Sequence, residues 1–247
     1  MRNGFIQKRG EVPMINSFYT AATGTIQMQK GMDVTANNIA NVSTTGFQAQ
    51  KGAFADLVYT NIHAAEGTDS DLVSGHGTKL AKTDTLFAAS ALENTSRSLD
   101  YALPEAYQFF AIRSGDTVKY TRNGNFHLSM QGNANYLVSS DGGYVLGANG
   151  QPIQVTDESA AAPVGVFTFS NCDGLQREAG TYFVETEASG QAQAVRDAEV
   201  RQGYLENSSV SLPDEMATIL ETQRAFQLNS KMVQISDEIM QTVNSLR

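Results

Sequence analysis

The sequence is poor in the residue types on which most enzymes and nucleic-acid-binding proteins depend. Its 247 residues include one cysteine, three histidines and no tryptophan. The lone Cys172 excludes an internal disulfide and a cysteine-based zinc site. The 17 Lys and Arg residues against 26 Asp and Glu give a net charge of -9. This charge argues against a nucleic-acid binder, because a phosphate backbone needs a basic face.

Long apolar runs are also missing. No stretch reaches the roughly 18 apolar residues that a helix needs to cross a bilayer. Residues 1–13, MRNGFIQKRGEVP, contain basic residues but no apolar stretch like a signal-peptide core. They show no periodicity either, and we expect them to form a disordered extension or to result from an upstream start codon chosen in error. If the protein leaves the cytoplasm, we expect a route that reads no cleaved secretory signal.

No group of titratable residues has the spacing of an active site. His63, His76 and His127 have no partner at metal-ligand spacing, and Asp69 and Asp71 lack the remaining residues of a calcium loop. The sequence contains no nucleophile elbow, phosphate loop or dinucleotide fingerprint. We therefore expect a protein that is not an enzyme and that has no metal or cofactor.

Both ends of the chain, residues 14–46 and 211–247, have the periodicity of long amphipathic helices. In the first, spacings alternate between four and three from Ile15 onward, which is typical of a helix–helix seam. The seam residues are Phe18, Ala22, Thr25, Gln29, Met32, Ala36 and Ile39. With two alanines and a glutamine, this seam would hold an isolated hairpin only weakly. Asn41 and the residues 43–46 supply the helix stop.

The C-terminal helix has two apolar stripes. The first recurs every seven residues and consists of Leu212, Ile219, Phe226, Val233 and Met240. Its companion seam positions, four residues later in each heptad, are Met216, Gln223, Ser230 and Asp237. The second, on another side, consists of Leu228, Met232, Ile235, Ile239, Val243 and Leu246. Two stripes need two sets of partners, and one N-terminal helix can cover only one of them. Either neighbouring subunits or the middle of the chain must cover the other.

The middle of the chain has the period of two that is typical of β-strands. Residues 117–121 and 126–128 predict a hairpin around Asn123-Gly124, and residues 136–138 and 144–146 predict a second one. Further turns and strands make residues 81–210 a central antiparallel β-rich domain, a small barrel or sandwich. Residues 47–80 are expected to be an extended connecting segment. The predicted class is therefore α+β, with a discontinuous coiled-coil domain formed by the two terminal helices.

Two strings at opposite ends resemble the signatures of the bacterial flagellar rod and hook family: ANNIANVSTTGF at 36–47 and ETQRAFQLNSKMVQISDEIMQ at 221–241. FADLVYTNI at 54–62, YTRNGNF at 120–126 and GYLENSSV at 203–210 agree with it. The signature residues are Asn37, Asn38, Asn41, Gly46, Phe47, Gln223, Arg224, Asn229 and Ser230. Asn38 and Asn41 either cap the helix end, which local bonding favours, or bond across subunits.

One segment departs from the family pattern. Such proteins usually have a glycine-rich turn before a Phe-Phe strand, where this chain has LPEAYQFF at 103–110. Within the family, the length and the FADLVY segment look most like a rod protein, the distal rod in particular. A proximal rod or hook-type subunit is the alternative.

The resemblance implies a structural subunit of the flagellar basal-body rod, outside the cytoplasm and periplasm-spanning in a Gram-negative source. Such subunits pass through the flagellar type III export apparatus and polymerise, with neighbouring rod and hook proteins, into a torque-transmitting helical tube around the export channel. Their terminal helices line the tube. The implied assembly interface consists of Phe18, Met32, Ile39, Leu212, Ile219, Phe226, Leu228, Met232, Val233, Ile235, Ile239 and Met240. A monomeric β-rich binding module braced by helices is the alternative of a different class.

Overall fold

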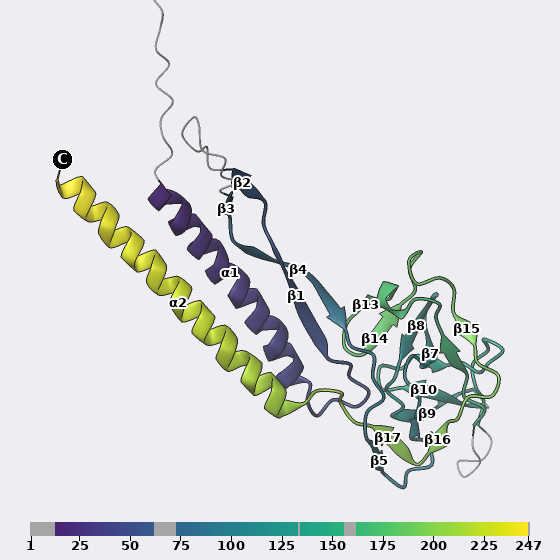
Figure 1. Ribbon diagram of the computed structural model, residues 1–247. Coiled ribbons are helices and arrows are strands. Elements are labelled where there is room, and N and C mark those ends of the chain that lie inside the picture. Colours follow the sequence, from purple (N-terminus) through teal and green to yellow (C-terminus); the bar gives the residue numbers. More distant parts are fainter. Residues whose placement is uncertain (1–12, 62–72, 133, 156–161, 247) are drawn as a thin grey trace, which may run out of the picture. The chain divides into compact units, whose positions relative to one another are not determined.

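The computed structural model describes residues 13–61, 73–132, 134–155 and 162–246. The expected N-terminal extension, apart from Pro13, lies outside these residues. The chain divides into two compact units (Figure 1). The helical unit is Met1–Ala36, Gly52–Thr83 and Met216–Arg247, and the β unit is Asn37–Lys51 and Asp84–Glu215.

The helical unit contains most of the two long helices. Together with the antiparallel strands of the β unit, these helices confirm the α+β class. Helix α1 spans Pro13–Ala40 and helix α2 spans Leu212–Ser245. They lie side by side in Figure 1 and run antiparallel. A Cβ atom added to Gly24 would lie 2.9 Å from Nδ2 of Asn229, and one added to Gly31 would lie 3.8 Å from Cγ2 of Thr222.

Short paired strands occupy much of the segment 47–80 that was expected to be an extended connection. Strand β1 (Gln50–Asp56) pairs with β4 (Thr78–Thr85), and β2 (Tyr59–Asn61) pairs with β3 (Val73–Gly75). The β1 strand packs on α1 through Phe54, because a Cβ atom on Gly31 would lie 2.9 Å from the Phe54 ring. Much of the described backbone on either side of residues 62–72 is therefore extended but paired.

A nine-stranded antiparallel sheet forms the centre of the β unit among the described residues. Its main order is β13-β14-β8-β7-β11-β10-β9, with β12 paired to β7 and β15. Two small ribbons, β5 with β17 and β6 with β16, lie outside it. A 3-10 turn, η1, spans Cys172–Gly174. The sheet strands are β7 (Phe109–Ser114), β8 (Thr117–Thr121), β9 (Phe126–Gln131), β10 (Ala134–Ser139), β11 (Tyr144–Val145), β12 (Val166–Thr168), β13 (Gln176–Arg177), β14 (Tyr182–Val184) and β15 (Gln193–Ala194). The ribbon strands are β5 (Leu92–Asn94), β6 (Tyr101–Ala102), β16 (Arg201–Gln202) and β17 (Tyr204–Glu206).

Strand pairing confirms one predicted hairpin and shows that the other is wrong. Strands β10 and β11 pair as expected, with Val138 opposite Tyr144. Strand β8, however, pairs with β7 and β14, while β9 pairs with β10 at the other end of the sheet. Gly124 therefore serves a close approach of two backbones and not a hairpin turn. A Cβ atom there would lie 1.7 Å from the carbonyl oxygen of Tyr101.

Buried aromatic side chains give the β unit a core of its own. In one cluster the rings of Phe110 and Phe126 meet edge to face, with centroids 5.3 Å apart. In the other, Phe109 contacts Phe87 and Phe183 at 5.4 and 5.8 Å. Full burial of such a side chain contributes about 1.5–3 kcal/mol. Several together are what an independently folding unit requires.

Candidate assembly interface

One face of α2 is covered within the chain. Thr222 and Asn229, which approach α1, belong to a row with alternating spacings of three and four, so the row forms one helix face. All of its members are half-buried except Ser236, which is buried: Ile219, Thr222, Phe226, Asn229, Val233, Ser236 and Met240. Most of the first predicted stripe thus lies toward α1, although Leu212 at its start is exposed.

The companions of that stripe differ from those predicted. Met216, Gln223 and Asp237, four residues after the stripe positions, are exposed. The covered companions instead follow the stripe positions by three residues, as Thr222 and Asn229 do. They are small or polar, so hydrophobicity alone does not identify them, whereas their small size allows α1 to come close.

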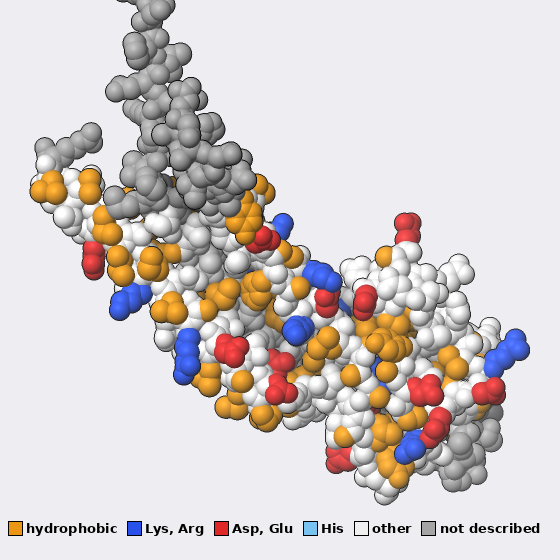
Figure 2. Space-filling view, in the orientation of Figure 1, with side chains coloured by type: hydrophobic (Ala, Val, Ile, Leu, Met, Phe, Trp, Pro, Cys, Tyr) orange, Lys and Arg blue, Asp and Glu red, His pale blue; other side chains and the backbone are white. Residues whose placement is uncertain are grey.

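The second stripe of α2 is exposed. Its relative exposure ranges from 38% at Ile235 to 83% at Leu246, and Met232 and Ile239 fall within this range. At 100° per residue it lies about 120° around the helix from the face toward α1. Figure 2 shows hydrophobic side chains along the visible side of α2. Among the described residues, this continuous apolar row therefore has no intrachain cover.

The covered face of α1 lies one residue earlier in each repeat than predicted. Its buried or half-buried members are Ala21, Gly24, Met28, Gly31, Thr35 and Asn38. Of the predicted seam, Gln29 and Ala36 are exposed, whereas Phe18, Met32 and Ile39 are half-buried beside this row. Glycine and alanine allow α2 and Phe54 to approach the backbone. Packing therefore selects the small residues, and the larger side chains flank the contact.

The signature asparagines at the end of α1 have different partners. Asn41 donates from Nδ2 to the carbonyl oxygen of Asn37 at 2.8 Å, and its Oδ1 accepts from the Thr44 hydroxyl at 3.2 Å. This is the local bonding expected at a helix end. Asn38 is not a cap: it is fully buried and bonds to Gln50 and Glu215.

Gly46 and Phe47 anchor the N-terminal signature in the β unit. Gly46 has a φ of 66°, and its N–H donates to the carbonyl oxygen of Glu206 at 2.9 Å. A Cβ atom on Gly46 would lie 2.5 Å from the backbone nitrogen of Asn123, so only glycine fits. The Phe47 ring is buried under the Arg177 guanidinium, 4.6 Å away. Burial lowers the pKa of Arg177 to about 10.

A buried ion pair, which the sequence reasoning missed, holds the same junction. Arg122 donates from Nε and Nη2 to the two carboxylate oxygens of Glu206, at 2.8 and 2.9 Å. Burial raises the pKa of the Glu206 carboxyl, and the attraction of Arg122 opposes that shift. The remaining guanidinium N–H groups donate to the carbonyl oxygens of Leu103, Glu105 and Gln108. A charged residue inside YTRNGNF and another inside GYLENSSV were the available signals.

The other candidate residues do not gather into a chemical site. Gln223 and Arg224 are exposed on α2, Ser230 is half-buried there, and His127 is exposed on β9. Among the described residues, no three His, Cys, Asp or Glu side chains are placed to hold a metal ion. In the same part of the chain, no helix is long and apolar enough to span a membrane. His63, Asp69 and Asp71 lie outside the described residues.

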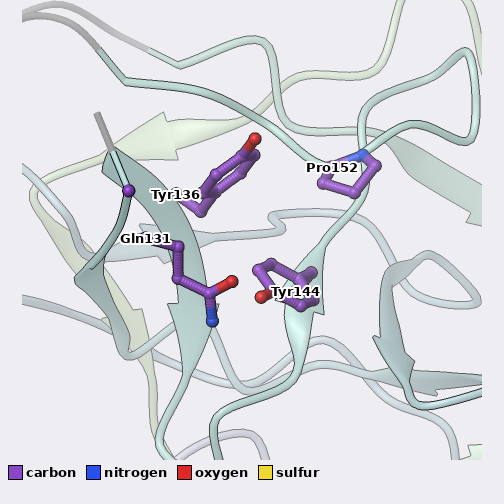
Figure 3. A pocket seen from close by; sticks show the side chains of 5 residues that line it. Gln131, Tyr136, Tyr144 and Pro152 are labelled. Carbon is purple, nitrogen blue, oxygen red and sulfur yellow. The ribbon is translucent and has the colours of Figure 1, made fainter. Parts of the chain in front are cut away.

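An open surface pocket of about 440 Å³ lies on the β unit (Figure 3). Gln131, Gly132, Tyr136, Tyr144 and Pro152 line it. The two tyrosine rings meet edge to face with centroids 5.6 Å apart. The lining includes no Asp, Glu, His, Lys or Cys side chain. A binding module of the alternative class could hold a ligand here.

Three protein-family models match the two ends and the middle of the chain. Residues 18–48 match the model described as flagella basal body rod protein. Residues 106–170 match the D1 domain of the flagellar hook protein FlgE/F/G. Residues 201–246 match the C-terminal part of the flagellar basal body rod FlgEFG protein.

Curated relatives match nearly the whole chain. The flagellar basal-body rod protein FlgG of Bacillus subtilis is 33% identical, over 95% of this chain and 100% of the relative. FlgG of Borreliella burgdorferi is also 33% identical, over 95% and 99%. The flagellar hook-basal body complex protein FlhP of Bacillus subtilis is 23% identical, over 95% and 100%.

Proposed function

This chain belongs to the flagellar basal-body rod protein family, and from that premise we propose that it polymerises through its terminal helices into a helical tube. It is a structural subunit of the flagellar basal-body rod and not an enzyme. In the proposed tube, α1 and α2 form a coiled-coil pair that lines the export channel. The tube transmits torque, and its subunits reach it through the flagellar type III export apparatus. Neighbouring rod and hook proteins adjoin its ends, and we place this chain in the distal rod.

The observation that carries the proposal is the exposed second stripe of α2. Met232, Ile235 and Ile239 form one row on α2 and are 38–48% exposed. A different face of the same helix contacts α1, so α1 does not cover this row. Covering such side chains contributes about 25 cal/mol per Å² of apolar surface removed from water. A row of this kind is favourable to cover and costly to leave in water. Copies of the same chain are the partner that a rod subunit always has beside it.

Symmetry supports a filament as the product of this contact. The stripe on one copy would meet a different surface on the next, including Phe18, Met32 or Ile39 at the edge of α1. A contact between two different surfaces, repeated by a screw operation, does not close on itself and gives a helical polymer. The half-buried residues of both helices then become fully buried only in the assembly.

Weak intrachain packing would delay this assembly until after export. The face of α1 toward α2 is rich in small residues such as Ala21, Gly24 and Gly31, and that of α2 contains Thr222 and Asn229. The larger residues of the α2 face are only half-buried, so the pair gains only part of their hydrophobic burial. Helix nucleation must nevertheless be offset by packing. We expect dilute subunits to show less helix than polymers do. Circular dichroism before and after assembly measures this difference.

The decisive experiment places a charge on the exposed stripe. Ile239→Asp should abolish assembly of the purified chain, because the carboxylate would be buried in the subunit contact. Gln234→Asp is the matched control: it adds the same charge on an exposed side of α2 away from both rows, and polymers should form normally. Sedimentation and electron microscopy measure assembly, and swimming of cells carrying only the variant measures function. Normal polymers and motility with Ile239→Asp would refute the proposed contact.

The variant Phe226→Asp tests the contact on the other face of α2. Phe226 is half-buried on the face toward α1, so a carboxylate there would disturb the intrachain helix pair first. Assembly would fail as a consequence of that damage. Ile239→Asp, by contrast, should leave the helix pair intact, and comparing the helix content of the two variants separates the two contacts.

A further inference from the structure

Asn38 joins three parts of the chain through one buried side chain. Its Nδ2 donates to the carbonyl oxygen of Gln50 at 2.7 Å and to Oε1 of Glu215 at 2.8 Å. Its Oδ1 accepts from the N–H of Gln50 at 2.9 Å. The side chain is fully buried, so water cannot replace these bonds. The amide thus ties the end of α1 to the start of α2 and to the start of β1.

The bond between Asn38 and Glu215 follows the same helix register as the contacts farther along. In the helical unit, Gly24 faces Asn229 and Gly31 faces Thr222. The residue numbers of each pair add to 253, and those of Asn38 and Glu215 do too. Successive pairs are seven residues apart on both helices. One antiparallel register therefore describes all three.

The packing of the helix faces specifies this register only weakly. Their residues recur every seven positions, so a slip of one heptad, about 10.5 Å along the axis, would again place small residues opposite the α2 row. Gly24 would then face Thr222 or Ser236 in place of Asn229. Apolar contact alone discriminates poorly between such arrangements. A buried polar residue at one seam position is a known way to specify register in helix pairs.

Slipping would be costly at Asn38. A shifted α2 removes the Glu215 acceptor from the buried amide, and a shifted α1 also removes both backbone partners on Gln50. A buried polar group that loses its partner costs about 1–3 kcal/mol. The β unit holds the adjacent chain in place: the N–H of Ala49 donates to the Ser209 hydroxyl at 2.8 Å, and the N–H of Ser209 donates to the carbonyl oxygen of Phe47 at 3.0 Å.

We propose that Asn38 sets the register of the terminal helix pair from its β-unit end. It acts as a positioning residue, and the small-residue seam then propagates the register that Asn38 specifies. This inference concerns a single chain and does not depend on polymerisation. It deepens the proposed function, because only a helix pair in register holds the second stripe of α2 at a fixed position along α1, where neighbouring copies would contact it.

Disulfide trapping in the full chain tests the inference. In a Cys172→Ser background, the pair Gly24→Cys with Asn229→Cys reports the observed register. The pairs Gly24→Cys with Thr222→Cys and Gly24→Cys with Ser236→Cys report slips of one heptad in either direction. Electrophoretic mobility separates intrachain disulfides from interchain ones. The ratio of in-register to slipped intrachain yield is the readout, so a low helix content in dilute chains does not affect it.

Asn38→Leu should lower that ratio at least about fivefold, because the polar penalty for slipping disappears. The matched control is Asn37→Leu, whose native side chain is exposed and makes two long bonds: its Nδ2 donates to Gln50 Oε1 at 3.4 Å, and its Oδ1 accepts from Asn41 Nδ2 at 3.3 Å. It should leave the ratio within about twofold. Glu215→Leu should lower the ratio, while Glu215→Gln, which retains an acceptor oxygen, should preserve it.

The Glu215 variants keep the test informative if Asn38→Leu fails to fold, since they leave both bonds between Asn38 and Gln50 in place. An unchanged ratio in Glu215→Leu, or in a folded Asn38→Leu, would overturn the role of Asn38. Polymer formation by the same proteins is scored separately. The disulfide ratio therefore tests the role of Asn38, and polymer formation tests the proposed function. The two proposals can fail independently of each other.

Discussion

Most of the phenylalanine side chains of the β unit are buried, whereas the large apolar side chains of α2 are exposed or half-buried. Phe109, Phe110, Phe126 and Phe183 have no exposed surface, and Arg122 is buried with all its donors bonded. Among the described residues of α2, the one buried residue is Ser236. The same chain thus contains one unit completed by its own contacts and one with apolar surface left for another molecule. Folding of the first and assembly of the second can be changed separately.

The largest expected effect comes from breaking the buried ion pair. Arg122→Met keeps the volume but leaves the Glu206 carboxylate buried without its cation, which should cost about 3–5 kcal/mol. Arg201→Met is the matched control, because its partner Glu199 and Arg201 itself are both exposed. Removing that pair should cost less than about 1 kcal/mol. Urea unfolding followed by the aromatic signal measures both. Equal stability of the two variants would contradict the claim that the buried ion pair helps to complete the β unit.

A smaller effect is expected in alkali. Burial, with help from Glu185, raises the pKa of Tyr120 to about 12. Because the folded unit retains the proton that the unfolded chain loses near pH 10, this contribution is complete below pH 10 and is lost as the pH rises toward 12. At about 1.4 kcal/mol per pKa unit, it is worth at most about 2.7 kcal/mol. Burial likewise raises the pKa of Tyr182 to about 12, while Arg177, with its lowered pKa, works in the opposite direction.

The variant Tyr120→Phe isolates the contribution of that hydroxyl. Its free energy of unfolding should fall less between pH 9 and pH 11.5 than that of the natural sequence, as measured by urea titration at each pH. Parallel pH dependence of the two proteins would show that Tyr120 does not carry the effect.

The smallest effect is expected at the segment that departs from the family pattern. Tyr107 has a φ of 61°, the left-handed region that glycine adopts without strain. Tyr107→Gly and Tyr107→Ala both remove the ring, which is 53% exposed, but only glycine relieves the backbone. Tyr107→Gly should therefore be more stable than Tyr107→Ala by about 1 kcal/mol. Thermal melting of the two variants makes the comparison, and a more stable alanine variant would contradict it.

Sequence reasoning worked best where local pattern decides. The heptad repeat of Ile219, Phe226, Val233 and Met240 predicted both the helix and its covered face. The glycine-punctuated hairpin of β10 and β11 formed as expected, since a short turn and its strands are neighbours in sequence. The uncovered second stripe followed from the same count of residues per turn. These features need no knowledge of distant segments.

Tertiary contacts decided the features that join residues far apart in the sequence. Arg122 and Glu206, 84 positions apart, form an ion pair that neither string shows alone. Gly124 looked like a turn glycine, but its role comes from the approach of Tyr101. The seam of α1 moved by one residue because small side chains meet α2, whereas periodicity favours large ones. The sequence by itself therefore determined the two helices, the β-rich middle and the surplus apolar stripe. The tertiary structure decided which surfaces meet, because backbone approach and buried polar bonding depend on partners that local sequence does not contain.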